Sequence, residues 1–373
     1  MSLSRRKFLL LAAGGIASRS PADAPLSRQE LAAMEGVASA FMTAHSIPGL
    51  SVAVSRGGDV LYERGFGFAD RETNLKVTPQ SLFRIASVSK PITSVTLFLL
   101  AEAKRLTLED TVFGPRGLLG DDFGTRPYQR WVEDIRIKHL LTHTSGGWQN
   151  NGTDPMFRNP AMNHQQLITW AINNIALEYP PGEHYAYSNF GYCILGRVIE
   201  KLAGAKYEQY VRDTVLKRCG VTDMRIAGNT LAERAAGEVI YYGAGVQDDP
   251  YNMNVRRMDS HGGWLATARD LAMFASHVDG HSVSRNMLQP ESIRQMTTAS
   301  SVNTGYAKGW AVNRVPNWWH GGSLPGTTSI MVRTASGFCW AALANSREAS
   351  ADTGLAMDQM MWNLVRQPRN WNA

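Results

Sequence analysis

The sequence predicts an α/β fold in which strands from both ends of the chain form one sheet, with a mainly helical segment inserted between them. Strand-like runs lie near the start, at residues 50–55 and 60–65, and return after about residue 305. The stretch from about 106 to 300 is instead helical and loop-rich, with clusters of Gly, Pro and Asp. Strands at both ends with helices between them favour a single sheet built by the two termini.

The first elements have recognisable boundaries. Ser27-x-x-Glu30 has the pattern of a capping box. The amphipathic helix that it opens has apolar residues at Leu31, Met34, Val37, Ala38, Phe41 and Met42. The two strand-like runs that follow are joined through residues 56–59, Arg-Gly-Gly-Asp, which are typical of a hairpin turn. We therefore expect a helix followed by a β-hairpin.

The end of the chain returns to strands and closes with a helix. Strand signals lie at 309–312, 318–320, 327–333 and 338–344, and a last amphipathic helix has Leu355, Met357, Met361 and Leu364 on its apolar face. The predicted units are an α/β domain and a helical insertion domain, formed by residues 25–105 with 300–373 and by residues 106–299.

Residues 1–24 are typical of a twin-arginine export signal. Arg5-Arg6 is followed by an apolar run of about ten residues, too short to span a bilayer as a helix. Ala22-Asp23-Ala24 supplies a cleavage site, so we expect a mature chain from about Pro25, located in the periplasm or secreted. The membrane would then be a partner only during export. The alternative is a simple membrane anchor.

Composition excludes some function classes. Without the signal, which holds four basic residues and one acidic residue, the formal charge falls from +6 to +3. No basic stripe is interleaved with aromatic residues, so nucleic acid is not an expected partner. Three cysteines, Cys193, Cys219 and Cys339, allow at most one disulfide, and at this length none is required. Cys193 and Cys339 lie in apolar runs and are predicted to be buried thiols.

The chemistry is predicted to centre on Ser87-Val88-Ser89-Lys90. This tetrapeptide opens a long apolar segment with helical periodicity. Because proline is tolerated only in the first turn of a helix, Pro91 places the tetrapeptide at the start of that helix. Ser87 and Lys90 then lie on one face of a helix N-terminus. The helix dipole and burial both lower the pKa of such a lysine, which suits it to accept a proton from serine. The pattern alone is weak, because Ser4-Arg5-Arg6-Lys7 matches it as well.

Two further motifs follow at a distance. Tyr187 and Asn189 lie two apart on a non-helical segment and can point the same way. A phenol serves as a general acid or base where neighbouring cations lower its pKa, and an amide offers both a donor and an acceptor. The alternative is a tyrosine packed under a loop and an asparagine capping the next helix.

The third motif is His320-Gly321-Gly322-Ser323, at the end of a predicted strand. The two glycines allow a ligand to approach the backbone closely, and the next N–H can complete an oxyanion hole. The alternative is a strand that simply ends in a glycine turn.

A metal site is not expected. His139 and His143 are spaced i, i+4, as in helical zinc pairs, but the glutamate of a zinc protease is missing between them. No cofactor is expected either. Tryptophans near the proposed site could line an acyl pocket but are more often core or rim; they are Trp148, Trp264, Trp318 and Trp319.

In this order, S-x-x-K, Y-x-N and H-G-G resemble the penicillin-recognising serine hydrolases, and the pattern is similar to class C β-lactamases, D-alanyl-D-alanine carboxypeptidases and family VIII carboxylesterases. The stretches at 140–146 and 262–271 agree, and the resemblance covers about residues 27–366. It implies a β-lactamase/penicillin-binding-protein-like fold: an antiparallel sheet flanked by the N- and C-terminal helices, with an inserted helical domain and the site in the cleft between them.

The resemblance also implies roles. Ser87 would be the acylated nucleophile and Lys90 its proton partner, and Tyr187 would shuttle the proton to the leaving group and help to activate water. Asn189 would orient Lys90 and the acyl group, while the N–H groups of Ser87 and Ser323 would form the oxyanion hole. Whether Lys90 or Tyr187 acts as the base in each step stays open.

The third motif departs from the family pattern. Many relatives have Lys-Thr-Gly or Lys-Ser-Gly, whose lysine helps to hold a substrate carboxylate, where this chain has His320. An unperturbed imidazole is mostly neutral at pH 7. This favours neutral esters, or amides without a terminal acid, unless an arginine such as Arg333 or Arg347 restores the anchor.

The sequence therefore predicts an exported serine hydrolase that forms an acyl-enzyme on small-molecule substrates, most simply esters, with transacylation where the pocket excludes water. One alternative is an enzyme for peptides or β-lactams: a D-amino-acid peptidase, a carboxypeptidase or a β-lactamase. The other is a non-catalytic, penicillin-binding-like protein that is acylated without turnover. The natural substrate, acyl length and oligomeric state are not determined at this level.

Overall fold

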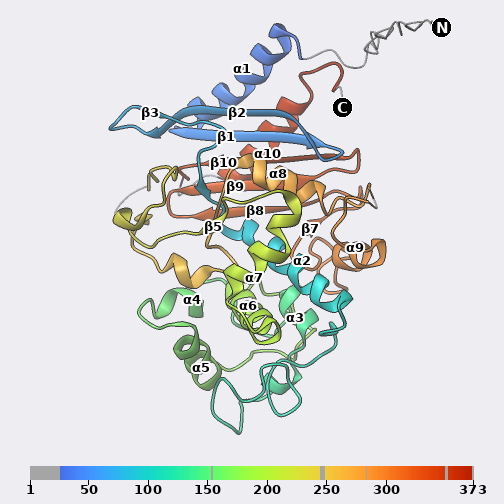
Figure 1. Cartoon of the computed structure of the whole chain (residues 1–373). Coiled ribbons are helices and arrows are strands. Elements are labelled where there is room, and N and C mark those ends of the chain that lie inside the picture. The colour runs from blue at the N-terminus through green and yellow to red at the C-terminus, as the bar shows by residue number, and fades with distance from the viewer. Residues whose placement is uncertain (1–25, 153, 244–247, 283, 349–351, 372–373) are drawn as a thin grey trace, which may run out of the picture.

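Figure 1 shows the computed structural model of the chain, which describes residues 26–152, 154–243, 248–282, 284–348 and 352–371. The predicted export signal and its cleavage site lie outside these residues. Among the helices that are described, none combines the length and the apolar character needed to cross a membrane.

The centre of the fold is a seven-stranded antiparallel sheet with the order β3-β2-β1-β10-β9-β8-β7 (Figure 1). Its strands come from both ends of the chain, which confirms the predicted fold class. The β1–β2 hairpin turns through Gly57 and Gly58, whose φ angles of 60° and 90° lie in the left-handed region that glycine adopts freely. The strands are β1 (Gly49–Arg56), β2 (Asp59–Asp70), β3 (Leu75–Lys76), β7 (Ala311–Val312), β8 (Trp318–Leu324), β9 (Thr327–Arg333) and β10 (Phe338–Ala344).

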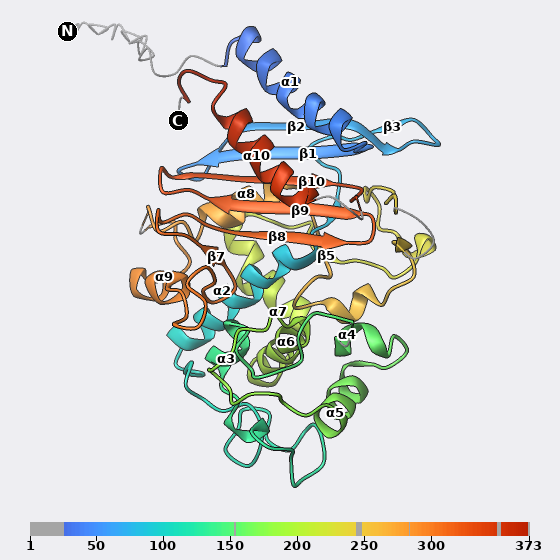
Figure 2. The ribbon, with the colours of Figure 1, turned by 180° about the vertical axis from the view of Figure 1, so that it is seen from behind.

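One face of the sheet is covered by the two terminal helices, α1 (Arg28–Ala44) and α10 (Thr353–Val365) (Figure 2). The capping box predicted at Ser27 is confirmed, since its hydroxyl accepts from the Glu30 N–H and the Glu30 carboxylate accepts from the Ser27 N–H. The buried residues of both helices pack with the outward side chains of β1, β9 and β10 in one apolar cluster.

The opposite face packs on α8 (Ala268–Ser276), and α2 (Ser89–Glu102) belongs to the same apolar cluster. Residues 268–276 fall within the predicted insertion, but they contact β1, β9 and β10 directly. In α2 almost every side chain is buried. A helix whose side chains are buried on every face lies in the interior of the protein. The helix α2 therefore lies between the sheet and the helical region.

Helices and loops form most of the rest of the molecule, below the large sheet in Figure 1. A small second sheet, which the sequence did not predict, is built by β4 (Phe83–Arg84), β5 (Arg225–Ile226) and β6 (Trp264–Ala266). The strand β4 leads the chain directly into the Ser87 segment. The helices of this region are α3 (Ile137–Leu141), α4 (Pro155–Arg158), α5 (His164–Asn174), α6 (Asn189–Ala203), α7 (Tyr207–Thr214) and α9 (Pro290–Thr297).

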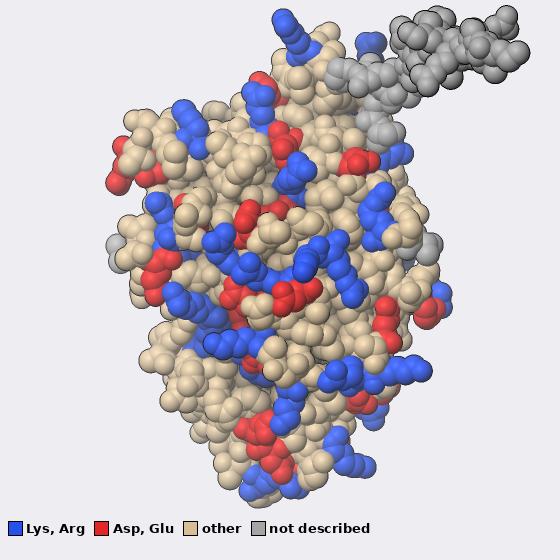
Figure 3. Space-filling model, viewed as in Figure 1, with Lys and Arg blue, Asp and Glu red and all other residues tan. Residues whose placement is uncertain are grey.

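Cys193 and Cys339 are buried thiols, as predicted, and the surface carries charges of both signs. Basic and acidic side chains are interspersed over the face shown in Figure 3. Cys193, Cys219 and Cys339 are all buried and none of them forms a disulfide.

Candidate active site

Ser87 lies in a single 3₁₀ turn, Ala86–Val88, between β4 and α2. The turn is held against the sheet, because the Ser329 hydroxyl donates to the Ile85 carbonyl at 2.7 Å. Ala86 has a φ of +47°, in the left-handed region that non-glycine residues rarely adopt. Backbone strain of this kind costs of order 1–3 kcal/mol and collects at functional sites.

Lys90 lies one turn further on, with its side chain fully buried. Its Nζ is 3.0 Å from the Ser87 Oγ, 2.8 Å from the Asn189 Oδ1 and 3.1 Å from the His261 carbonyl oxygen. Burial holds its pKa well below the ordinary lysine value, as the sequence analysis expected.

The three neighbours of Nζ decide what a neutral Lys90 can do. Two of them, the Asn189 Oδ1 and the His261 carbonyl oxygen, accept hydrogen bonds only. An uncharged amine has two N–H bonds and one lone pair. When both N–H bonds go to these oxygens, the lone pair is left facing the Ser87 hydroxyl, which is the geometry of a general base.

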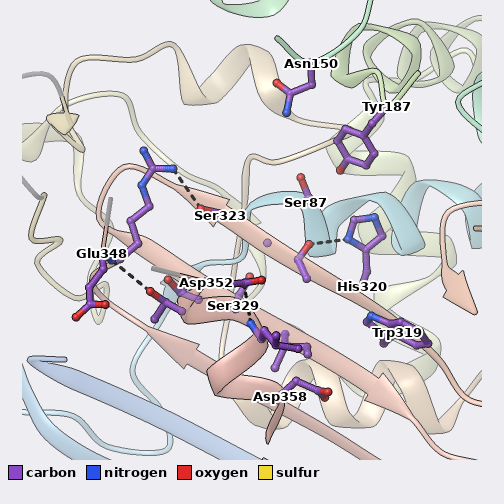
Figure 4. A pocket seen from close by; sticks show the side chains of 18 residues that line it. Ser87, Asn150, Tyr187, Trp319, His320, Ser323, Ser329, Glu348, Asp352 and Asp358 are labelled. Carbon is purple, nitrogen blue, oxygen red and sulfur yellow. Dashed lines mark hydrogen bonds between the residues drawn. The ribbon is translucent and has the colours of Figure 1, made fainter. Parts of the chain in front are cut away.

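Tyr187 lies in the loop that leads into α6, beside both members of the pair. Its ring centroid is 4.7 Å from the Lys90 Nζ, and its side chain lies beside that of Ser87 (Figure 4). Neighbouring cations do not lower the pKa of this phenol: burial raises the pKa of Tyr187, and burial lowers that of Lys90. The phenol is therefore protonated in the resting site and is placed to donate.

Asn189 is the first residue of α6, where Ser188 caps the helix by accepting from the Gly191 N–H. The helix cap is thus supplied by Ser188, and the Asn189 side chain is directed to Lys90. Tyr187 and Asn189 both reach Lys90, so they do point the same way. The Nδ2 of Asn189 donates to the Asp154 Oδ2 at 3.0 Å.

His320 is buried on β8, and its ring is held at both nitrogens. Its Nδ1 lies 2.6 Å from the Gly321 carbonyl oxygen and its Nε2 lies 3.0 Å from the Tyr306 hydroxyl. The Tyr306 hydroxyl is also 3.1 Å from the Nε2 of His143, whose Nδ1 accepts from the Ser188 N–H. Burial lowers the pKa of His320 to about 3, so the imidazole carries no charge near neutral pH.

The glycines of β8 have different surroundings. A Cβ on Gly322 would overlap the Ile85 carbonyl oxygen and the Ser329 hydroxyl, whereas a Cβ on Gly321 would have its nearest neighbour 3.9 Å away. Gly322 therefore lets β8 approach the Ser87 turn, and Gly321 faces open space.

The N–H of Ser323 is available for a ligand. The β8–β9 hairpin turns through two residues, with Leu324 opposite Thr327. In such a hairpin the pair beside the turn is hydrogen-bonded and the next pair is not. The Ser323 N–H therefore points away from β9, toward an edge that β7 covers only at Trp318 and Trp319.

These groups open into two cavities, of which Figure 4 shows the larger. A cavity of about 570 Å³ is lined by Ser87, Tyr187 and the His320–Ser323 segment, and one of about 320 Å³ by Ser87 with Asn189. Arg347 lines both: it pairs with Asp248 and donates to the Ser323 hydroxyl at 3.2 Å. The wall of the larger cavity also holds three carboxylates, those of Glu348, Asp352 and Asp358.

Arg333 lies elsewhere. It donates to the carbonyl oxygens of Asp279 and Pro316 and stacks on the Trp318 ring, and it lines neither cavity. Of the two arginines considered as a substitute anchor, the structure brings only Arg347 to the site.

The histidine pair considered as a metal site has other partners. The Nδ1 of His139 accepts from the Arg136 N–H at 3.1 Å, and His143 lies among the rings of Tyr185, Tyr187, Tyr192 and Tyr306. Within the described ranges no group of three or more His, Cys, Asp or Glu residues is arranged to hold a metal ion.

His139, which caps α3, supplies a test of how burial changes the pKa of a histidine in this fold. Burial lowers its pKa to about 4 from the ordinary 6.5, so the unfolded chain binds more protons between these values. The free energy of unfolding should therefore fall as the pH drops through this window, by about 1 kcal/mol per pH unit for this residue. His139→Gln keeps an acceptor for the helix cap. In this variant the free energy of unfolding, measured with urea, should depend less on pH. His184→Gln, at an exposed histidine, is the control, and an equal effect of both would contradict the prediction.

Sequence reasoning missed several of the residues that complete the site. Asp154 holds the Asn189 amide, Tyr306 bridges two histidines, and the carboxylates of the cavity wall come from the segment after β10. No motif marks these positions. An aspartate before a proline at 154–155 signals a helix cap, but nothing in the sequence places it beside Lys90.

The chain is similar to several known proteins. The Beta-lactamase family profile matches residues 34–358. Penicillin-binding protein 4* of Bacillus subtilis is 32% identical over 197 residues, which are 51% of this chain and 41% of that protein. Penicillin-binding protein 4 of Amycolatopsis lactamdurans is 28% identical, with 84% of each chain covered. The chain spans between a third and about three fifths of the length of the first relatives that it matches.

Among solved structures, the D-amino acid amidase of Ochrobactrum anthropi SV3 superposes with a TM-score of 0.74 at 20% identity, covering 91% of this chain and 98% of that one. This likeness shows the fold. The matched profile covers most of the chain and shows that the chain belongs to the Beta-lactamase family.

Proposed function

We propose that the protein is an exported hydrolase that forms an acyl-enzyme at Ser87 and acts on esters that carry no carboxylate beside the scissile bond. The observation that best supports Ser87 as the nucleophile is the fully buried Lys90, whose Nζ lies 3.0 Å from the Ser87 hydroxyl. The other two neighbours of Nζ are oxygens that accept hydrogen bonds from it. Residues 1–24 would direct export.

The geometry supports a two-stage reaction. Neutral Lys90 takes the proton of the Ser87 hydroxyl as the Oγ bonds to the substrate carbonyl carbon, and the N–H groups of Ser87 and Ser323 stabilise the oxyanion. Tyr187 donates its proton to the departing alkoxide and recovers one from Lys90. In the second stage, water attacks the carbonyl carbon of the acyl-enzyme and gives a proton to Lys90 or Tyr187. The bond to the Ser87 Oγ then breaks, the carboxylic acid product leaves, and the Oγ takes that proton back.

The substrate class follows from the charges around the cavity. His320 is neutral, because its pKa is lowered to about 3, so it offers no fixed cation where many relatives have lysine. Arg347 is paired with Asp248, and three carboxylates share the cavity wall. A substrate carboxylate would meet net negative charge here, whereas a neutral ester would not.

A second candidate is hydrolysis of D-amino-acid amides or short peptides with a free amine. The same wall carboxylates, Glu348, Asp352 and Asp358, suit an ammonium group on the substrate. The superposed D-amino acid amidase makes this class a specific alternative.

The test compares a short-chain p-nitrophenyl ester, a chromogenic cephalosporin and a D-amino-acid p-nitroanilide. We expect ester turnover to dominate and to fall by on the order of 10³-fold or more in Ser87→Ala. Faster anilide turnover would favour the second candidate. Faster cephalosporin turnover, lost selectively in Arg347→Gln, would show that Arg347 anchors a carboxylate and would overturn the ester assignment. Acylation of Ser87 without product release would identify a binding protein instead.

A further inference from the structure

Asp154 is a buried carboxylate behind the site, outside the three motifs. It caps α4 and is 1% exposed. Its two oxygens accept hydrogen bonds from different elements: the Oδ1 from the Met156 N–H at 2.9 Å and the Oδ2 from the Asn189 Nδ2 at 3.0 Å. Through the Asn189 amide it is connected to Lys90.

The bond to Asp154 decides which way the Asn189 amide faces. A carboxylate accepts only, so the amide must turn its NH₂ group to Asp154 and its oxygen to Lys90. With the amide reversed, the NH₂ group would face Nζ and compete for the amine lone pair. The orientation fixed by Asp154 is therefore the one in which that lone pair is left for Ser87.

Asp154 also sets the electrostatics of the proton transfer. Three histidines and two tyrosines face Lys90. The histidines are His143 after α3, His261 before β6 and His320 in β8. The tyrosines are Tyr187, which precedes α6, and Tyr192, which lies within it. Burial lowers the pKa of all three histidines and raises that of both tyrosines, so they are uncharged.

Among the described residues, Asp154 is the carboxylate that acts on Lys90, and it raises the pKa of Lys90 against the larger effect of burial. Its own pKa is raised by burial and lowered by its bonds to Asn189 and Met156 and by Lys90.

We propose that Asp154 is a positioning residue for the Ser87–Lys90 pair: it fixes the Asn189 amide so that Lys90 presents its lone pair to Ser87, and it stabilises the ammonium that forms when Lys90 takes the proton. The four residues form a chain, Ser87–Lys90–Asn189–Asp154, in which a buried carboxylate orients the base through an amide. The inference rests on the proposed roles of Ser87 and Lys90.

Asp154→Asn is the test variant, because its amide can still cap α4 while the charge is removed and the Asn189 orientation is no longer fixed. We expect kcat for p-nitrophenyl butyrate to fall roughly 10²-fold with KM little changed. The acid limb of the pH profile reports the loss of neutral Lys90, so it should move to lower pH by about one unit once the negative charge is gone. A structural defect alone would leave that limb in place.

The rate at which a fluorophosphonate probe labels Ser87, followed by mass spectrometry across the same pH range, measures activation of the serine independently of substrate preference. The double variant Asn189→Asp with Asp154→Asn returns a carboxylate oxygen to Lys90. It should move the acid limb to higher pH and, above that limb, recover at least tenfold of the lost labelling rate. Asp270→Asn removes a capping carboxylate in α8 that lines neither cavity, and it should leave both the labelling rate and the acid limb unchanged.

The outcomes separate the two proposals. A wild-type protein whose Ser87 is not labelled, or a Ser87→Ala variant that keeps its activity, overturns the proposed function and this inference with it. Labelling at Ser87 with an unshifted acid limb and an unchanged rate in Asp154→Asn overturns the inference alone. A folded Asp154→Asn variant that loses rate without any shift of the limb, and is not recovered by the double variant, also overturns it.

Discussion

Replacement of Lys90 by methionine is expected to lower kcat on the order of 10³-fold while the protein stays folded. Methionine fills a similar buried volume but cannot accept the Ser87 proton. The fold should tolerate the change, because a fully buried amine is costly to keep and an apolar side chain of similar size removes that cost. The measurement is kcat together with the midpoint of thermal unfolding.

Lys90→Arg is the matched control for charge. Arginine keeps a cation near Ser87 but does not release its proton in proteins. We expect this variant to be as inactive as Lys90→Met at every pH. If the arginine variant retained most of the activity, Lys90 would act as a fixed charge, and the assignment of Lys90 as the base would be wrong.

Gly322→Ala is expected to give the second large effect, a loss of both activity and stability. The added methyl group would overlap the Ile85 carbonyl oxygen, which is backbone directly before the Ser87 turn. Overpacking of this kind costs about 1–3 kcal/mol of unfolding free energy. Because the strain falls on the turn and on β8 together, Ser87 and the Ser323 N–H should move apart, and acylation should slow by roughly 10²-fold.

The neighbouring glycine separates steric effects on the fold from effects on the cavity. Gly321→Ala places its methyl group in open space and should leave the thermal midpoint unchanged. Any change in the activity of Gly321→Ala would then come from the altered shape of the cavity wall. Equal losses of stability in the two variants would show that close approach of β8 to the turn is not what Gly322 provides.

The site places three uncharged histidines and a set of tyrosines around one buried lysine. His143, His261 and His320 each have their pKa lowered, first by burial and then by Lys90. A second cation beside Lys90 would make its ammonium form harder to reach. The network His143–Tyr306–His320 thus surrounds the base with polar but neutral groups, which leaves Asp154 to supply the opposing charge.

Much of the fold was predictable, because the signals are local. The capping box at Ser27, the hairpin through Gly57 and Gly58 and the strand runs after 305 each depend on residues within a few positions of one another. The small β4–β5–β6 sheet was not predicted. Its strands are two or three residues long, and β6 pairs with β5 across about 40 positions and with β4 across about 180, so no periodicity marks them.

The sequence by itself determined the pairing of Ser87 with Lys90, because residues three apart at a helix start share one face whatever surrounds them. It also determined, through an ordered set of motifs, which family the chain belongs to. Only the tertiary structure decided the protonation states: Tyr187 has a raised pKa and His320 a lowered one because both are buried, and burial depends on the whole fold.

The tertiary structure likewise decided what orients the base. The Asn189 oxygen that faces Lys90 comes from a residue 99 positions away, and the His261 carbonyl from one 171 positions away. Asp154 reaches Asn189 from a loop 35 residues earlier in the chain. Contacts between segments so far apart leave no spacing for a motif to record, because they arise from packing of whole elements rather than from the geometry of one helix or strand.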